Sequence, residues 1–131
     1  MAFVNWEPQT YTVGSVQMDH QHEKLFEIIN RYAAAMDRMA SRAELTQIFD
    51  EVVAFAAYHF QDEEAMMARN NYPELPRHKL IHQALVKQVT ELKQELAAGE
   101  AGVESKIKFF LKTWLTAHIK GIDTKYSTYL H

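Results

Sequence analysis

His59 and Glu63 stand four residues apart inside a long segment whose apolar residues recur with the period of a helix. Four residues turn an α-helix by about 400°, so the two side chains leave the same face. The rest of that face is apolar and comprises Leu45, Ile48, Val52, Phe55 and Met66. A buried carboxylate must be paired or bound to a metal. A hydrogen-bonded His–Glu pair would meet that requirement, and for this pair taken alone it is the favoured interpretation.

The composition of the 131-residue chain fits one globular domain, residues 1–131. A net charge of −3 gives no basic surface for nucleic acid, and no apolar run is long enough for membrane insertion. Nothing near the N-terminus resembles a secretory signal. Cysteine is absent, which excludes disulfides and thiolate metal sites and favours a cytoplasmic location.

Only four glycines and three prolines interrupt the chain, and helical periods recur along most of it. We expect an extended arm over residues 1–17, followed by four amphipathic helices over about 19–38, 42–68, 76–98 and 103–128. Short links between such helices are typical of an antiparallel bundle. The sequence therefore predicts an all-α, up-down four-helix bundle with an N-terminal extended arm whose aromatic residues lie over the body.

Capping signals place the ends of these helices. Asp19 is expected to be the N-cap of the first helix. Ser41 with Glu44 three residues later forms a capping box at the start of the second. Pro76 suits the first position of the third helix, and Gly99 suits its C-terminal cap.

Every predicted helix carries polar metal-binding side chains on the stripe that should be buried. Burying so many polar groups without a central partner would cost several kcal/mol each. A satisfied core histidine explains one such residue, but it does not explain five histidines and two carboxylates in one small bundle. A metal centre explains them together. The seven residues are His22, His59, Glu63, His78, His82, His118 and Asp123.

Asp123 is the one member of this set whose spacing is irregular. It follows His118 by five residues, which turn a helix by about 500°, so the two side chains do not share one line of a regular helix. Either Asp123 reaches in from the seam between helices, or Gly121 permits a local widening of the turn. The sequence leaves both alternatives open.

The number of donors indicates how many ions they hold. Structural zinc takes four protein ligands and catalytic zinc three, so seven are too many for one zinc. Two octahedral ions offer twelve positions. Five histidines and two bridging carboxylates fill nine of them, and a bridging oxygen fills two more. One position remains for a small ligand. Mixed imidazole and carboxylate ligation suits iron, with manganese as the alternative.

These residues and their neighbours resemble the hemerythrin family, and within it the single-domain bacterial hemerythrins. The resemblance covers almost the whole chain, and all seven ligand positions are occupied. Its motifs are Val13-Gly14 and Met18-Asp19-His20-Gln21-His22; His59-Phe60 with Glu63; Tyr72-Pro73 before His78 and His82; and Trp114-Leu115 before His118, Asp123 and Tyr126.

The resemblance implies a non-haem di-iron centre, oxo- or hydroxo-bridged, that binds dioxygen reversibly for transport or storage. It implies that Glu63 and Asp123 bridge the two irons. One iron would be held by His78, His82 and His118, and the other, with the open position, by His22 and His59. His20 and His131 are not expected to be ligands.

The resemblance also implies a ligand pocket beside the open position. Trp114 and Leu115 would lie next to bound dioxygen, with Phe60 close by. Tyr126 is expected to hydrogen-bond near a bridging carboxylate. Each of these residues could instead be ordinary core.

Two other functions compete with an oxygen carrier. A di-iron oxidase of the ferritin-like type would carry E-x-x-H motifs, and the chain has none. Its histidine-rich shell should also stabilise high oxidation states less, so we expect no enzymatic activity. An oxygen, redox or nitric oxide sensor is the second alternative, and it would have to act through a separate partner. The sequence does not identify a partner that receives the oxygen.

Overall fold

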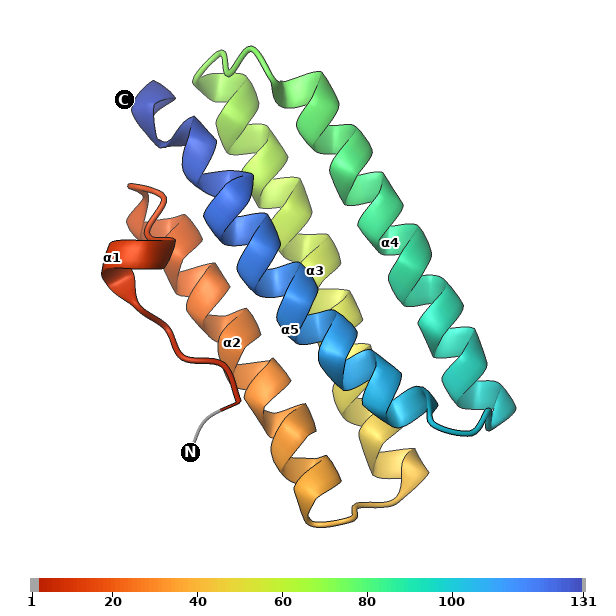
Figure 1. Cartoon of the computed structure of the whole chain (residues 1–131). Helices are drawn as coiled ribbons and strands as arrows, with labels where there is room; N and C mark the ends of the chain where they lie inside the picture. Colours follow the sequence, from red (N-terminus) through yellow and green to blue (C-terminus); the bar gives the residue numbers. More distant parts are fainter. Residues whose placement is uncertain (1–2, 131) are drawn as a thin grey trace.

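The structure, a computed structural model that describes residues 3–130, is an antiparallel up-down bundle of four long α-helices (Figure 1). Across these residues it contains no strand, so the predicted all-α four-helix fold is confirmed. None of the helices in this range is long and apolar enough to cross a membrane. The long helices are α2 (Val16–Asp37), α3 (Arg42–Arg69), α4 (Leu75–Ala98) and α5 (Val103–Gly121).

The helices form a ring in which α2 packs against α3 and α5, and α4 packs against the same two. Because neighbours run in opposite directions, the first turns of α2 and α4 lie at the same end of the bundle as the last turns of α3 and α5 (Figure 1). We call this end the donor end and the opposite end the apolar end. Chain direction alone thus brings together four segments that are far apart in the sequence.

The apolar end is held by large side chains that are fully buried between all four helices. Tyr32, Phe49, Leu96 and Ile107 come from α2, α3, α4 and α5 respectively, and each is inaccessible to solvent. Fully burying one such aliphatic or aromatic side chain contributes about 1.5–3 kcal/mol. Tyr32 satisfies its hydroxyl by donating to the carbonyl of Glu104 at 3.1 Å.

The N-terminal arm is not wholly extended, because it contains a single-turn helix, α1 (Pro8–Tyr11), that lies beside α2 (Figure 1). Its aromatic side chains do cover the body. Trp6 and Tyr11 pack edge-on against Phe26, with ring centroids 5.6 and 5.2 Å away. Asn30 pairs with both backbone groups of Val4 at 2.8 Å. Residues 1–2 of the predicted arm lie outside the described range.

The predicted start of the first helix was wrong. Ser15, not Asp19, is the N-cap of α2, and its hydroxyl accepts a hydrogen bond from the Met18 backbone N–H at 3.2 Å. Asp19 lies in the first turn and binds the arm instead. Its carboxylate accepts hydrogen bonds from the Thr12 hydroxyl at 2.6 Å and from the Val13 N–H at 2.9 Å.

The other predicted caps agree better with the structure. The Ser41 hydroxyl caps α3 by accepting from the Glu44 N–H at 3.2 Å. Helix α4 begins at Leu75, so Pro76 occupies its second position. Gly99 ends α4 in the left-handed conformation, with φ at 75°, which strains any other residue.

The segment predicted as one helix over 103–128 is broken. Helix α5 ends at Gly121, and the φ of Ile122, −115° with ψ at −56°, differs from the φ of about −63° of a regular α-helix. A tighter 3₁₀ helix, η1 (Asp123–Tyr129), follows. The helix therefore ends after Gly121 instead of widening there. Asp123 then enters the bundle as the first residue of η1.

Candidate metal centre

All seven predicted donor residues meet in the half of the bundle nearest the donor end. His22 is on α2, His59 and Glu63 on α3, His78 and His82 on α4, His118 on α5 and Asp123 on η1. All are buried, and His22, Glu63 and Asp123 are completely inaccessible to solvent. Of the other two histidines, His20 is exposed, and His131 lies outside the described residues.

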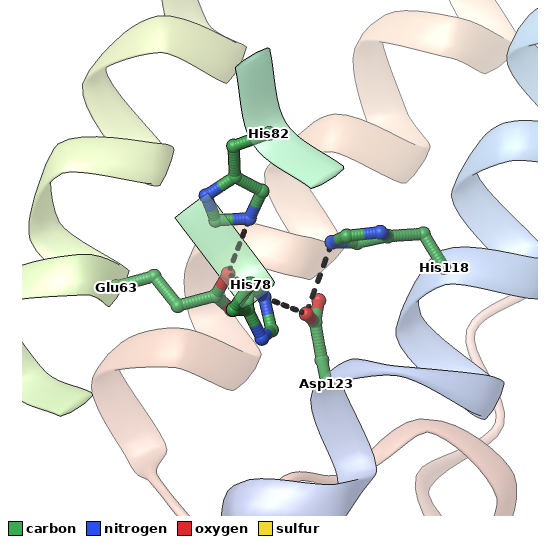
Figure 2. A group of neighbouring side chains, drawn as sticks. All are labelled: Glu63, His78, His82, His118 and Asp123. Atoms are coloured by element: carbon green, nitrogen blue, oxygen red, sulfur yellow. Dashed lines mark ion pairs between the residues drawn. The ribbon is translucent and has the colours of Figure 1, made fainter. Parts of the chain in front are cut away.

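Three histidines lie around one oxygen of Glu63 and one oxygen of Asp123, with two histidines beside each oxygen (Figure 2). Glu63 Oε1 lies 3.3 Å from His78 Nε2 and 3.1 Å from His82 Nε2. Asp123 Oδ1 lies 3.0 Å from both His78 Nε2 and His118 Nε2. One donor atom from each of these five residues lies within 4.8 Å of the others. We call this group the three-histidine side.

The other oxygen of each carboxylate faces the two remaining histidines. Glu63 Oε2 lies 3.5 Å from both His22 Nε2 and His59 Nε2, and Asp123 Oδ2 lies 3.2 Å from His22 Nε2. These four residues also offer donor atoms within 4.8 Å of one another. We call this group the two-histidine side. Each carboxylate thus presents one oxygen to each side, which is the arrangement a bridging carboxylate needs.

The buried atoms that face the centre of this cluster lack hydrogen-bond partners. Leaving a buried donor or acceptor unsatisfied costs about 1–3 kcal/mol, and more for a charged group. So many together would be strongly destabilising, whereas metal ions would use all of them as ligands. The residues present therefore fit a metal centre. The atoms are Nε2 of His22, His78, His82 and His118, Glu63 Oε1, and both oxygens of Asp123.

The outer nitrogen of His59 is fixed by a two-step chain of hydrogen bonds. The Gln21 amide donates through Nε2 to Asp62 Oδ2 at 2.8 Å, so its oxygen faces His59 Nδ1 at 2.6 Å. Since an amide oxygen only accepts, His59 carries its proton on Nδ1. Its Nε2 then has a free lone pair directed at the cluster, as a metal ligand requires.

The outer nitrogen of His82 is also held by a hydrogen-bond acceptor, but here the acceptor is a carboxylate. His82 Nδ1 lies 2.8 Å from Glu64 Oε2, a carboxylate oxygen that accepts the Nδ1 proton. Sequence reasoning missed both Gln21 and Glu64. Gln21 directly precedes His22, and Glu64 directly follows Glu63. Each of them contacts a histidine on another helix, so the periodicity within one helix could not reveal the contact.

Tyr126 donates its phenolic hydrogen to Glu63 Oε2 at 2.7 Å, inside the bundle. Burial, together with the nearby charges of Glu63 and Asp123, raises the pKa of Tyr126 far above its usual range. The phenol therefore keeps its proton and remains a donor. It fixes the orientation of the Glu63 carboxylate from outside the cluster.

The two carboxylates dominate the electrostatics of the metal-free site. Burial alone would lower the pKa values of His22 and His78, but Asp123 and Glu63 outweigh it and raise both to about 9. Burial would likewise raise the pKa of each carboxyl, but the surrounding histidines hold both well below their usual range. Without metal, His22 and His78 are thus protonated at neutral pH beside two ionised carboxylates.

Aromatic side chains cover the three-histidine side. Phe60 stacks on the His82 ring with centroids 3.9 Å apart and planes 10° apart. Trp114 meets Phe60 edge-on at 6.1 Å and lies 6.5 Å from the His118 ring. Its buried indole N–H has no hydrogen-bond partner. Leu115, three residues before His118, is 1% exposed and belongs to the main apolar core.

Comparison with known proteins agrees with this geometry. The family model "Hemerythrin HHE cation binding domain" matches residues 13–130. A bacteriohemerythrin of Stenotrophomonas maltophilia is 32% identical over 97% of this chain and 81% of its own length. A myohemerythrin of Riftia pachyptila is 33% identical over 92% and 88%. A crystal structure of wild-type hemerythrin superposes with a TM-score of 0.90 at 27% identity, covering 98% of both chains.

Proposed function

This chain belongs to the hemerythrin family, and we propose that it binds dioxygen reversibly at a centre of two iron ions, as an oxygen carrier or store. The observation that carries the proposal is the sharing of Glu63 and Asp123 between two groups of histidines. Each carboxylate has one oxygen on the three-histidine side and the other on the two-histidine side. A single ion would not use both oxygens of both residues in this way.

The two sides differ in the number of donors they supply. The three-histidine side offers five donor residues and the two-histidine side four, counting both carboxylates on each side. Two octahedral ions joined by one further oxygen would then lack a single ligand, on the two-histidine side. We infer that the small ligand binds there.

Ferrous ions supply the electrons that dioxygen takes up when it binds. The protein supplies the conditions that keep this binding reversible. Phe60 stacks on the His82 ring and Trp114 lies beside the His118 ring. Leu115 and Ile119 are buried in the same apolar core, and these four side chains would exclude water from the centre. Tyr126 and Gln21 hold Glu63 and His59 in place, so the donors need not rearrange when the ligand arrives or leaves. Such fixed groups suit a binding protein better than an enzyme that must accept a substrate.

Stoichiometry is the first test. Protein produced with ample iron should contain about two iron ions per chain, as two groups of donors require. Glu63→Ala should reduce the content at both positions, because it removes a donor from each side. The matched control is His20→Ala, which removes an exposed imidazole from α2 and should leave the iron content unchanged. One tightly bound zinc ion per chain would overturn the proposal.

Reversibility is the second test, and it separates a carrier from an oxidase. The iron-loaded protein is reduced without oxygen, exposed to air, and then returned to an oxygen-free atmosphere while its visible spectrum is recorded. We expect the absorption to appear and disappear over repeated cycles with no consumption of a substrate. A single irreversible change, with peroxide or another product released in proportion to the protein, would show an enzyme or a damaged centre and refute the proposal.

A further inference from the structure

The outer nitrogens of two histidines in the centre are held by partners of different charge. His82 Nδ1 lies 2.8 Å from the carboxylate of Glu64, whereas His59 Nδ1 lies 2.6 Å from the neutral amide of Gln21. His82 belongs to the three-histidine side and His59 to the two-histidine side. The difference in charge therefore separates the two sides of the centre.

The carboxylate partner makes its side the more electron-rich. A carboxylate that accepts the Nδ1 hydrogen of an imidazole makes Nε2 a stronger donor than a neutral amide does. The negative charge of Glu64 also lies directly behind the His82 ring, where it favours the more positive state of an ion held at Nε2. Both effects act on the three-histidine side.

The two-histidine side is weakened as a donor in two ways. Asp62 carries a charge, but the Gln21 amide stands between Asp62 and His59, with Gln21 Nε2 2.8 Å from Asp62 Oδ2. Tyr126 donates to Glu63 Oε2, the carboxylate oxygen that faces this side, and so draws electron density from it. The oxygen that faces the three-histidine side, Oε1, has no such hydrogen bond.

We propose that Glu64 and Gln21 are positioning residues that make the two iron positions electronically unequal. The first electron added to a diferric centre is held on the two-histidine side, and the second is held on the three-histidine side. In each step one electron from an external chemical reductant converts one ferric ion into one ferrous ion. This inference rests on the proposed function, because it requires two iron ions.

A redox titration of the iron-loaded protein, followed in the visible spectrum, resolves the two steps. Glu64→Gln keeps an oxygen that can accept from His82 Nδ1 but removes the charge. We expect it to raise the potential of the second step by about 59 mV, a tenfold change in the ferric-to-ferrous ratio, and to leave the first step nearly unchanged.

The reciprocal variant is Gln21→Glu combined with Asp62→Asn, because a new carboxylate would otherwise face Asp62 where the Gln21 amide now donates at 2.8 Å. It places a carboxylate beside His59 and should lower the potential of the first step by a similar amount. Adding Glu64→Gln to this variant should bring the two potentials closer together than either change does alone. The matched control is Glu91→Gln, which removes the same charge from an exposed position of α4 and should move neither step. If the change at Gln21 reduces iron loading, the Glu64→Gln titration alone tests the inference, by showing which of the two reduction steps shifts.

The inference is wrong if Glu64→Gln shifts neither step, or shifts both equally, at the iron content of the unmodified protein. An equal shift would mean that the charge acts on the centre as a whole and not on one side. Failure of the proposed function looks different, because the unmodified protein would then lack two iron ions or reversible oxygen binding before any variant is compared.

Discussion

At the apolar end of the bundle the four helices meet through side chains such as Phe49, Leu96 and Ile107, whereas at the donor end they meet through five imidazoles and two carboxylates. The apolar end needs no partner, since removing its side chains from water is itself favourable. The donor end is buried just as completely, but its inward atoms lack hydrogen bonds. One half of the bundle therefore stabilises the fold, and the other half uses that stability to hold a set of groups that would not cluster unaided.

The donor end is also closed by a second apolar cluster on its outer side. Val13, Met18, Met67, Tyr72 and Tyr126 are buried together there. The donor residues thus form a polar layer between two apolar layers. In such a layer charges interact more strongly than in water, so small differences between neighbouring groups have large effects.

Phe49→Ala, which creates a cavity in the apolar end, is the strongest test of whether the two ends of the bundle are independent. Phe49 is completely buried, so the change should lower the free energy of unfolding by about 3–5 kcal/mol. The loss should be similar with and without metal, and the folded fraction should still take up iron normally. Chemical denaturation and metal analysis measure the two quantities. Reduced iron content in the folded fraction would show that the two ends are not independent.

Leu115→Ala probes the boundary between the two ends. Leu115 is buried in the main core, three residues before His118, so its truncation should cost about 2–5 kcal/mol. We expect near-normal iron content and a faster decay of the absorption of the oxygenated protein, because water gains access to the centre. The decay rate is compared with that of unmodified protein at equal iron loading.

Equal decay rates in that comparison would assign Leu115 to the core alone and direct the search to Phe60 and Trp114. These two residues contact the rings of His82 and His118 directly.

The apolar stripes and the convergence of the donors could be predicted because both follow from a regular period. Residues four apart share a helix face, so His59 with Glu63 and His78 with His82 were placed correctly on inward faces. Antiparallel packing then brings the four faces together. The position of Asp123 could not be predicted in this way, because it depends on where α5 stops and η1 begins.

The hydrogen bonds around the donors were not predictable from one helix at a time. Whether Gln21 reaches His59, or Glu64 reaches His82, depends on the relative shift of two helices along their axes. Asp19 shows a related difficulty at the helix start. Its side chain suits an N-cap, but Ser15 takes that role and Asp19 binds the arm. Local preference was outweighed by a contact with another part of the chain.

Changes in pH should affect the metal-free and iron-loaded proteins in opposite directions. In the metal-free protein the pKa values of His22 and His78 are raised from 6.5 to about 9. Their protonated forms therefore stabilise the fold fully below pH 6.5, and this contribution is lost as the pH rises through about 9. The lowered pKa values of Glu63 and Asp123 keep their contribution intact until much lower pH.

We accordingly expect the thermal midpoint of the metal-free protein to decrease as the pH rises from 6.5 to 9. The iron-loaded protein should instead be stable across this range and lose metal on acidification, because imidazole must be neutral to bind a metal. Thermal unfolding of both forms between pH 5 and 9 measures the contrast. A metal-free midpoint that stays constant or rises above pH 6.5 would contradict the charge distribution described for the donor end.

The smallest expected effect comes from a matched pair of helix caps, one at each end. Ser41 caps α3 at the apolar end and Ser15 caps α2 at the donor end, each through a hydrogen bond of 3.2 Å to a backbone N–H. Replacing either by alanine should cost about 1 kcal/mol. Ser41→Ala should lower the thermal midpoint equally with and without iron, because the apolar end is ordered in both forms. Ser15→Ala should lower it fully in the iron-loaded protein but less in the metal-free protein, whose unsatisfied donor end opens locally before the rest of the bundle. Equal losses in both forms for both variants would mean that the donor end is as firmly ordered without metal as with it.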